Sequence, residues 1–136
     1  MKNTLFIVWN ESNNTGICII DEQHKGIIST INSLYYFVQN GNGIEIIKPI
    51  LIMIEQYIEI HFKVEESLML QSKYTSISEH IKLHKELAAK TKTLLIDANK
   101  NKDPNEVIRF LKEWWINHIN AEDKKYVPFI EKLIAN

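Results

Sequence analysis

Residues 58–66 read IEIHFKVEE, and two polar residues in this stretch, His61 and Glu65, stand four positions apart. The same spacing separates His80 from His84. In an α-helix, residues four apart project from one face, so each pair places two side chains that can bind a metal side by side. The two pairs therefore predict two helices, each with metal-binding groups gathered on one face.

Apolar residues recur at helical spacing through most of the chain and predict four long helices. We expect these helices at about residues 21–40, 45–70, 76–99 and 104–120. Asp21 is the expected N-cap of the first helix. Pro49 is expected in the first turn of the second helix, where its missing N–H costs little. Pro128 should interrupt the chain and start a short C-terminal helix.

The connections between these helices are short, which favours neighbours that run antiparallel. The sequence thus predicts an all-α protein in which residues 21–136 form an up-down-up-down four-helix bundle. Residues 1–20 are expected to form an extended arm that packs on the bundle. We expect residues 1–136 to be a single domain, because 136 residues suffice for one hydrophobic core.

The composition argues against several classes of partner. Hydrophobic residues make up 45% of the chain, charged residues 24%, and the net charge is −1, so neither a nucleic acid nor a membrane is expected to bind. The densest apolar stretch, residues 44–60, contains charged residues and suits an amphipathic helix. Cys18 is the only cysteine, and no segment resembles a signal peptide, so we expect a cytoplasmic protein. We identify no large apolar stripe and expect a monomer.

The histidines provide the main functional argument. The chain has five of them, His24, His61, His80, His84 and His118, and every predicted helix contributes at least one. Taken singly, each could be an ordinary surface residue, and a pair at helical spacing could be a surface contact worth about 0.2–0.5 kcal/mol. Taken together, they would meet in the core of a bundle, where polar groups without partners are costly. A metal site would satisfy all of them at once.

The number of donors indicates two metal ions. Five imidazoles and two carboxylates are too many for one ion. Two octahedral ions that share both carboxylates and one solvent-derived oxygen bridge would use all of these donors and leave one position open. Mixed imidazole and carboxylate ligands suit iron, although zinc and copper also accept imidazole.

The order of these residues resembles the ligand pattern of the hemerythrins. The matching residues are His24, His61-x-x-x-Glu65, His80-x-x-x-His84 and His118-x-x-x-x-Asp123. Residues around them match as well: Ile20-Asp21-Glu22-Gln23-His24-Lys25, His61-Phe62, Trp114-Trp115-x-x-His118-Ile119 and Tyr126. The resemblance covers nearly the whole chain, including the arm with Trp9.

The resemblance implies two iron ions per chain, which bind dioxygen. Three imidazoles would hold one ion: His80, His84 and His118. Two would hold the other ion, which keeps the open position: His24 and His61. Two carboxylates, Glu65 and Asp123, would bridge the ions together with an oxo or hydroxo group.

Helical periodicity and the resemblance disagree about one ligand. Glu122 follows His118 by four residues and shares its helical face, whereas Asp123 is about 140° further around an ideal helix. The hemerythrin pattern nevertheless favours Asp123. We therefore expect a widened turn or a helix end near residues 120–123. Glu66 and Glu122 are expected to be solvated or paired with lysines.

Apolar residues beside the ligands predict a water-excluding oxygen pocket formed by Phe62, Trp114, Trp115 and Ile119. Plain core packing is the alternative interpretation of these residues. We expect a binding protein for storage, delivery or sensing of dioxygen and not an enzyme, since the site is richer in imidazole than di-iron oxygenases usually are. The alternatives are a di-iron redox enzyme acting on nitric oxide or peroxide, and a structural site for a metal such as zinc.

Overall fold

The computed structural model describes residues 5–101 and 103–135, with the side chains of residues 44, 115, 116 and 120 excepted. Its long helices are α1 (Cys18–Gln39), α2 (Ile44–Gln71), α3 (Ile77–Asn101) and α4 (Asn105–Trp114). Short elements complete it: the 3-10 helix η1 (Glu11–Asn13), the π-helix η2 (Trp115–Glu122), α5 (Asp123–Lys125) and α6 (Val127–Ala135). The described residues contain no β-strand.

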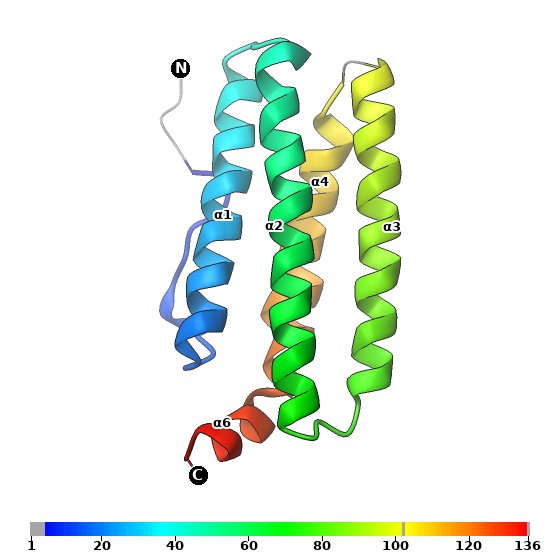
Figure 1. The fold of residues 1–136 in the computed structure, drawn as a ribbon. Helices are drawn as coiled ribbons and strands as arrows, with labels where there is room; N and C mark the ends of the chain where they lie inside the picture. Colours follow the sequence, from blue (N-terminus) through cyan, green and yellow to red (C-terminus); the bar gives the residue numbers. More distant parts are fainter. Residues whose placement is uncertain (1–4, 102, 136) are drawn as a thin grey trace.

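The four long helices lie side by side and each runs antiparallel to the next (Figure 1). Helix α1 packs on α2, α2 on α3, α3 on α4, and α4 returns to α1, which closes the bundle. Helix α6 lies across the end at which α1 begins and α2 ends. The expected all-α, up-down-up-down bundle with a short C-terminal helix is confirmed.

The first helix begins at Cys18, three residues earlier than expected, and Asp21 is not its N-cap. The N-cap residue is Ile17, which makes no side-chain cap. The carboxylate of Asp21 instead accepts hydrogen bonds from the backbone and hydroxyl of Thr15, both at 2.8 Å, and from the Gly16 amide at 3.1 Å. Gly16 has a φ of +84°, which turns the arm back over the start of α1 and brings these donors to the carboxylate.

The expected position of Pro49 was also wrong. Helix α2 begins at Ile44, so Pro49 is its sixth residue and lies in the second turn. In a regular helix that position would donate its N–H to the carbonyl of Glu45, and proline has no N–H to donate. The helix continues to Gln71 in spite of this loss.

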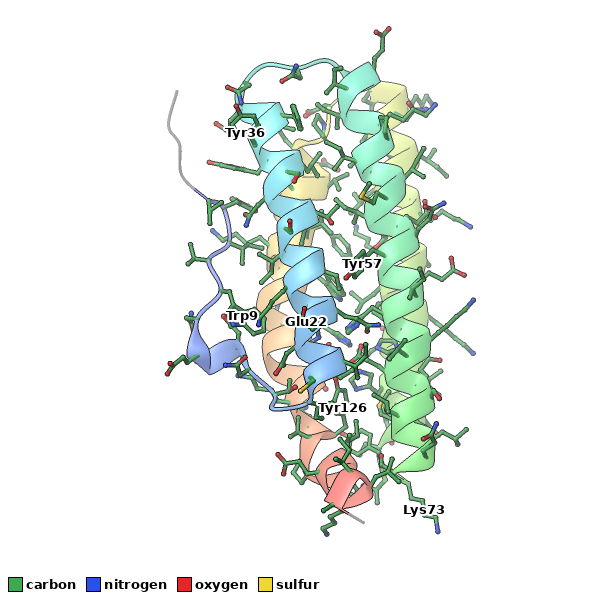
Figure 2. The ribbon with its side chains drawn as sticks, turned by 60° about the vertical axis from the view of Figure 1, so that its left-hand side comes forward. Trp9, Glu22, Tyr36, Tyr57, Lys73 and Tyr126 are labelled. Carbon is green, nitrogen blue, oxygen red and sulfur yellow. The ribbon has the colours of Figure 1, made fainter. Side chains whose placement is uncertain are left out.

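The arm follows the outer side of α1, as expected, and includes the single turn η1 (Figure 2). Asn32 of α1 holds it by three hydrogen bonds. Its side-chain oxygen accepts from the amides of Phe6 and Ile7 at 3.0 and 2.9 Å, and its side-chain nitrogen donates to the Ile7 carbonyl at 2.9 Å. The ammonium of Lys25 lies 5.3 Å from the centre of the Trp9 ring and adds a cation–π contact.

The apolar core is divided into two clusters. The larger one fills most of the bundle and includes Ile31, Leu34 and Leu111. The smaller one lies under α6 and includes Ile20, Tyr126 and Ile130. Along the sequence, most of the polar residues singled out above fall between residues of the two clusters, and His61 and His118 directly precede Phe62 and Ile119, the last members of the larger cluster on their helices. A polar layer therefore crosses the bundle with apolar side chains on both sides.

One part of the α2 surface differs from expectation. Ile46, Met53 and Ile60 recur every seven residues on α2, and their side chains are 50%, 55% and 60% exposed. We expected a monomer because we identified no large apolar stripe on the surface. These three exposed residues remove that argument for a monomer. None of the helices in the described part of the chain is both long enough and apolar enough to cross a membrane.

Replacing Asn32 with alanine should release the arm, since each of its hydrogen bonds contributes about 0.5–1.5 kcal/mol. The expected result is a free energy of unfolding lower by about 1–3 kcal/mol, with faster hydrogen exchange at the Phe6 and Ile7 amides. The control is Ser33→Ala, because the exposed hydroxyl of Ser33 bonds only to a carbonyl of its own helix. Unchanged exchange at both amides in Asn32→Ala would contradict this role of Asn32.

Candidate metal centre

The polar layer consists of the seven residues that the sequence singled out. Four helices and the short α5 contribute them: His24 from α1, His61 and Glu65 from α2, His80 and His84 from α3, His118 from η2, and Asp123 from α5. All seven are buried, and none has more than 4% of its surface exposed. Such a concentration of titratable groups inside a bundle requires a compensating interaction.

The seven residues form two groups that overlap. Within each group the donor atoms lie within 4.8 Å of one another. One group contains three imidazoles, those of His80, His84 and His118; we call it the three-histidine group. The other contains two, those of His24 and His61; we call it the two-histidine group. Glu65 and Asp123 belong to both groups, so the two carboxylates lie between the two sets of imidazoles.

The imidazoles direct their Nε2 atoms at the carboxylates. His61 Nε2 lies 2.8 Å from Glu65 Oε1, and His118 Nε2 lies 2.9 Å from Asp123 Oδ1. Yet the Nε2 atoms of His80, His84 and His118, Oε1 of Glu65 and both oxygens of Asp123 make no hydrogen bond of acceptable geometry. Buried polar atoms in this state are costly. A metal ion in each group would satisfy them, so this buried cluster of His, Glu and Asp fits a di-iron site.

A π-helix brings Asp123 into the cluster. The backbone N–H of Asp123 donates to the His118 carbonyl, five residues earlier, as π-helical pairing requires. Residues five apart therefore share a face here, and Asp123 Oδ1 meets His118 Nε2. Glu122 points elsewhere and its carboxylate bonds to Lys125 Nζ at 2.8 Å. The expected widened turn is confirmed, and it is longer than expected because η2 begins at Trp115.

The charges of the cluster shift its proton affinities. Burial raises the pKa of the Asp123 carboxyl, but His118, His24 and His61 outweigh burial and hold that pKa well below its usual range. Burial and Asp123 raise the pKa of Glu65, and His61 and His84 outweigh them and lower it. Burial lowers the pKa of His61, but Glu65 and Asp123 raise it to about 10. Without metal, a proton on His61 thus supplies part of the positive charge that the carboxylates require.

Comparison with known proteins agrees with this geometry. A family model, the hemerythrin HHE cation binding domain, matches residues 15–130, which include all seven residues. The chain belongs to the hemerythrin family. The resemblance to the hemerythrins is thereby confirmed.

Several hemerythrins are similar to this chain along most of its length. The bacteriohemerythrin of Pseudomonas paraeruginosa is 31% identical over 125 residues, which cover 91% of this chain and 81% of that protein. The bacteriohemerythrin of Methylococcus capsulatus is 32% identical over 116 residues, 84% of this chain and 88% of that protein. A crystal structure of wild-type hemerythrin superimposes with a TM-score of 0.82 at 27% identity, covering 92% of this chain and 98% of that one.

Aromatic rings brace the three-histidine group of this hemerythrin. Phe62 stacks on His84, with ring centres 3.9 Å apart and planes 8° apart. Trp114 lies nearly parallel to His118, with centres 6.3 Å apart, and meets Phe62 edge to face. Both rings are buried, as is Ile119. Of the four residues expected in the oxygen pocket, only Trp115 has a side chain outside the described residues.

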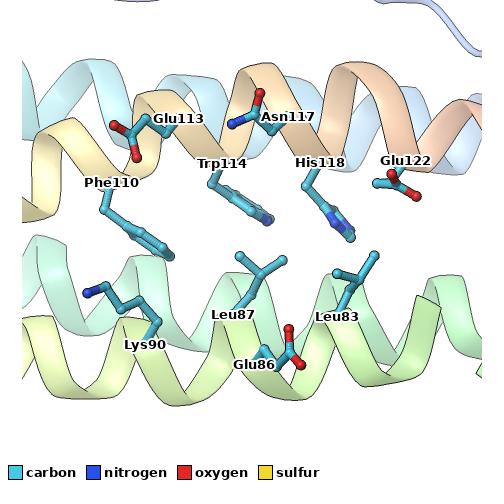
Figure 3. A pocket seen from close by; sticks show the side chains of 10 residues that line it. All are labelled: Leu83, Glu86, Leu87, Lys90, Phe110, Glu113, Trp114, Asn117, His118 and Glu122. Atoms are coloured by element: carbon cyan, nitrogen blue, oxygen red, sulfur yellow. The ribbon is translucent and has the colours of Figure 1, made fainter. Parts of the chain in front are cut away.

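Two surface grooves reach the three-histidine group. One runs between α3 and α4–η2, has an apolar lining that includes Leu83, Leu87 and Trp114, and reaches His118 (Figure 3). Charged side chains from both helices stand along it: Glu86, Lys90, Glu113 and Glu122. The other groove runs between α2 and α3 and reaches His84. His24 and His61, by contrast, have no exposed surface.

Three further side chains bond to the cluster from outside. Tyr126 donates its hydroxyl to Glu65 Oε2 at 2.6 Å, and burial together with Glu65 and Asp123 raises the pKa of this phenol, so it stays protonated. Gln23 Oε1 lies 2.8 Å from His61 Nδ1, and Glu66 Oε2 lies 2.8 Å from His84 Nδ1. These are the contacts that the sequence did not reveal.

The expectation of a solvated Glu66 was incomplete, because this partly exposed carboxylate also lies 2.8 Å from His84 Nδ1. The pairing of Glu122 with Lys125 is as expected. Glu66 stands beside Glu65 in sequence, but its partner, His84, is 18 residues away on another helix. Helical periodicity cannot reveal such a contact, because it depends on how α2 and α3 pack.

The raised pKa of His61 leads to a test of the metal-free chain. The folded pKa, about 10, exceeds the ordinary value of 6.5, so protonation of His61 stabilises the fold below about pH 6.5, and this stabilisation is lost as pH rises through 10. The thermal unfolding midpoint of metal-free protein should fall over this interval. The lowered pKa values of Glu65 and Asp123 act only at acid pH.

The iron-loaded protein is the control, because metal displaces the proton and removes this dependence. A midpoint of the metal-free protein that stays constant between about pH 6.5 and 10 would show that His61 is not protonated there.

Proposed function

We propose that this hemerythrin binds dioxygen reversibly at a pair of iron ions. The observation that carries the proposal is the inequality of the two buried groups. Both share Glu65 and Asp123, but one offers three imidazoles and the other only two. The group with fewer imidazoles would leave one coordination position free for a small molecule.

Each side chain of the cluster then has a role. His80, His84 and His118 would hold one ion. His24 and His61 would hold the second ion, next to the open position. Glu65 and Asp123 would bridge the ions together with an oxo or hydroxo group. Support comes from the donor set, because mixed imidazole and carboxylate ligands suit iron.

When bound, two ferrous ions would supply the electrons that dioxygen takes up and would recover them when it leaves. The chain's part is to keep water away from the pair. The apolar clusters lie on both sides of the polar layer, and Phe62, Trp114 and Ile119 are buried beside it. We propose that these residues, with Trp115, keep water from the oxygen pocket. Phe62 and Trp114 do so from the three-histidine side, where their rings lie beside those of His84 and His118.

Membership of the hemerythrin family supports oxygen binding over catalysis. The ligand set points the same way, because di-iron oxygenases usually rely on more carboxylates than the two found here.

The function can be tested by an optical titration combined with metal analysis. Anaerobic protein is loaded with ferrous iron, the iron per chain is counted, and dioxygen is admitted and then removed. We expect two irons per chain and a charge-transfer absorption band that appears with dioxygen and disappears without it. An oxidised product that does not return to the ferrous form would contradict reversible binding and favour a redox enzyme, to be assayed with nitric oxide and peroxide.

The choice between Asp123 and Glu122 has its own test. Asp123→Asn removes the charge of a carboxylate that lies between both groups and should lower the iron affinity by about 10-fold or more. Glu122→Gln makes the same chemical change one residue earlier, at a side chain that bonds to Lys125, and should leave iron content and the absorption band unchanged. Equal losses in the two variants would contradict the assignment of Asp123.

A further inference from the structure

The two groups differ in the partners that their imidazoles have on the outer side. His84, in the three-histidine group, has its Nδ1 atom 2.8 Å from the carboxylate of Glu66. His61, in the two-histidine group, has its Nδ1 atom at the same distance from the amide oxygen of Gln23. Both partners are acceptors, so both imidazoles carry their proton on Nδ1 and keep Nε2 free to bind a metal.

The difference between the two partners is one of charge. Glu66 is a carboxylate whose side chain is 32% exposed, and water in the α2–α3 groove can solvate its charge. Gln23 is neutral and part-buried. A hydrogen bond from an imidazole to a carboxylate is stronger than one to an amide and makes the opposite ring nitrogen a better electron donor. His84 should therefore donate more electron density to its metal than His61 does.

We propose that Glu66 and Gln23 act as positioning residues that make the two ions unequal, so that the ion of the three-histidine group loses the first electron. This inference rests on the proposed di-iron site. A stronger donor stabilises ferric over ferrous iron, and the third imidazole acts in the same direction. The ion beside the open position then stays ferrous in the half-oxidised protein.

The test is an anaerobic redox titration of the iron-loaded full chain, followed optically. Ferricyanide removes one electron in each of two steps, and each step converts one ferrous ion to ferric. Three variants are compared with the unsubstituted protein. Glu66→Gln removes the charge beside His84, Gln23→Glu adds one beside His61, and Glu59→Gln is the matched control. Glu59 lies on the same helix, has a side chain that is 66% exposed, and pairs with Lys63.

We expect Glu66→Gln to make the first oxidation harder by about 10-fold in its equilibrium constant, which corresponds to about 59 mV for one electron. Its second step should move much less. Gln23→Glu should make the second oxidation easier by a similar factor and leave the first nearly unchanged. Both substitutions thus bring the two steps closer together, from opposite sides, and Glu59→Gln moves neither step.

Three results would overturn the inference. The first is an equal shift of both steps in each variant, which indicates only a general change of charge. The second is the reverse order, with Glu66→Gln acting on the second step. The third is loss of iron from both variants while Glu59→Gln retains it, which would make the outer partners necessary for ligand placement and not for tuning. If only Glu66→Gln loses iron, Gln23→Glu still tests the inference: an easier second oxidation supports it, and an unchanged second oxidation overturns it.

This experiment and the oxygen titration can fail independently. Reversible oxygen binding, combined with equal shifts of the two oxidation steps, would contradict this inference and leave the proposed function standing. If the two oxidation steps respond as expected but the product formed with dioxygen does not return to the ferrous form, the proposed function would be contradicted and this inference would stand. Fewer than two irons in the unsubstituted protein would remove both.

Discussion

Imidazoles from four helices meet around the carboxylate of Asp123. Its two oxygens lie within 3.6 Å of four imidazole Nε2 atoms, those of His24, His61, His80 and His118. These four imidazoles come from α1, α2, α3 and η2. Asp123 itself is completely buried. A charge in this position is tolerable only if positive charge gathers around it, so the packing of all four helices is tied to what this layer binds.

The rest of the molecule encloses this layer and orients its side chains. Two apolar clusters enclose it, and the smaller one depends on α6 and on Tyr126, which also bonds to Glu65. Outside the imidazoles, Gln23 and Glu66 fix the orientation of two rings. Rings of Phe62 and Trp114 lie against two others. These contacts fix the orientation of side chains in the layer, which favours a metal site there.

The two halves of the layer are built differently. The three-histidine group has a charged outer partner, aromatic neighbours on each of its imidazoles and two grooves that approach it from the surface. The two-histidine group has a neutral outer partner and imidazoles with no exposed surface. The two sides of the layer therefore differ in the charge of their outer partner and in their exposure to the surface.

The amino-acid sequence by itself determined the helices and most of the candidate metal-binding residues. Helical periodicity is a local property, so the pairs His61–Glu65 and His80–His84 could be placed on single faces without knowledge of the fold. Between Asp123 and Glu122, periodicity favoured Glu122 and the hemerythrin pattern favoured Asp123. Only the tertiary structure gave the physical reason for Asp123, because a π-helix breaks the local period and survives only if packing favours it. The partnership of Glu66 with His84 was likewise decided by the packing of α2 against α3, since it joins two helices whose relative register no local pattern specifies.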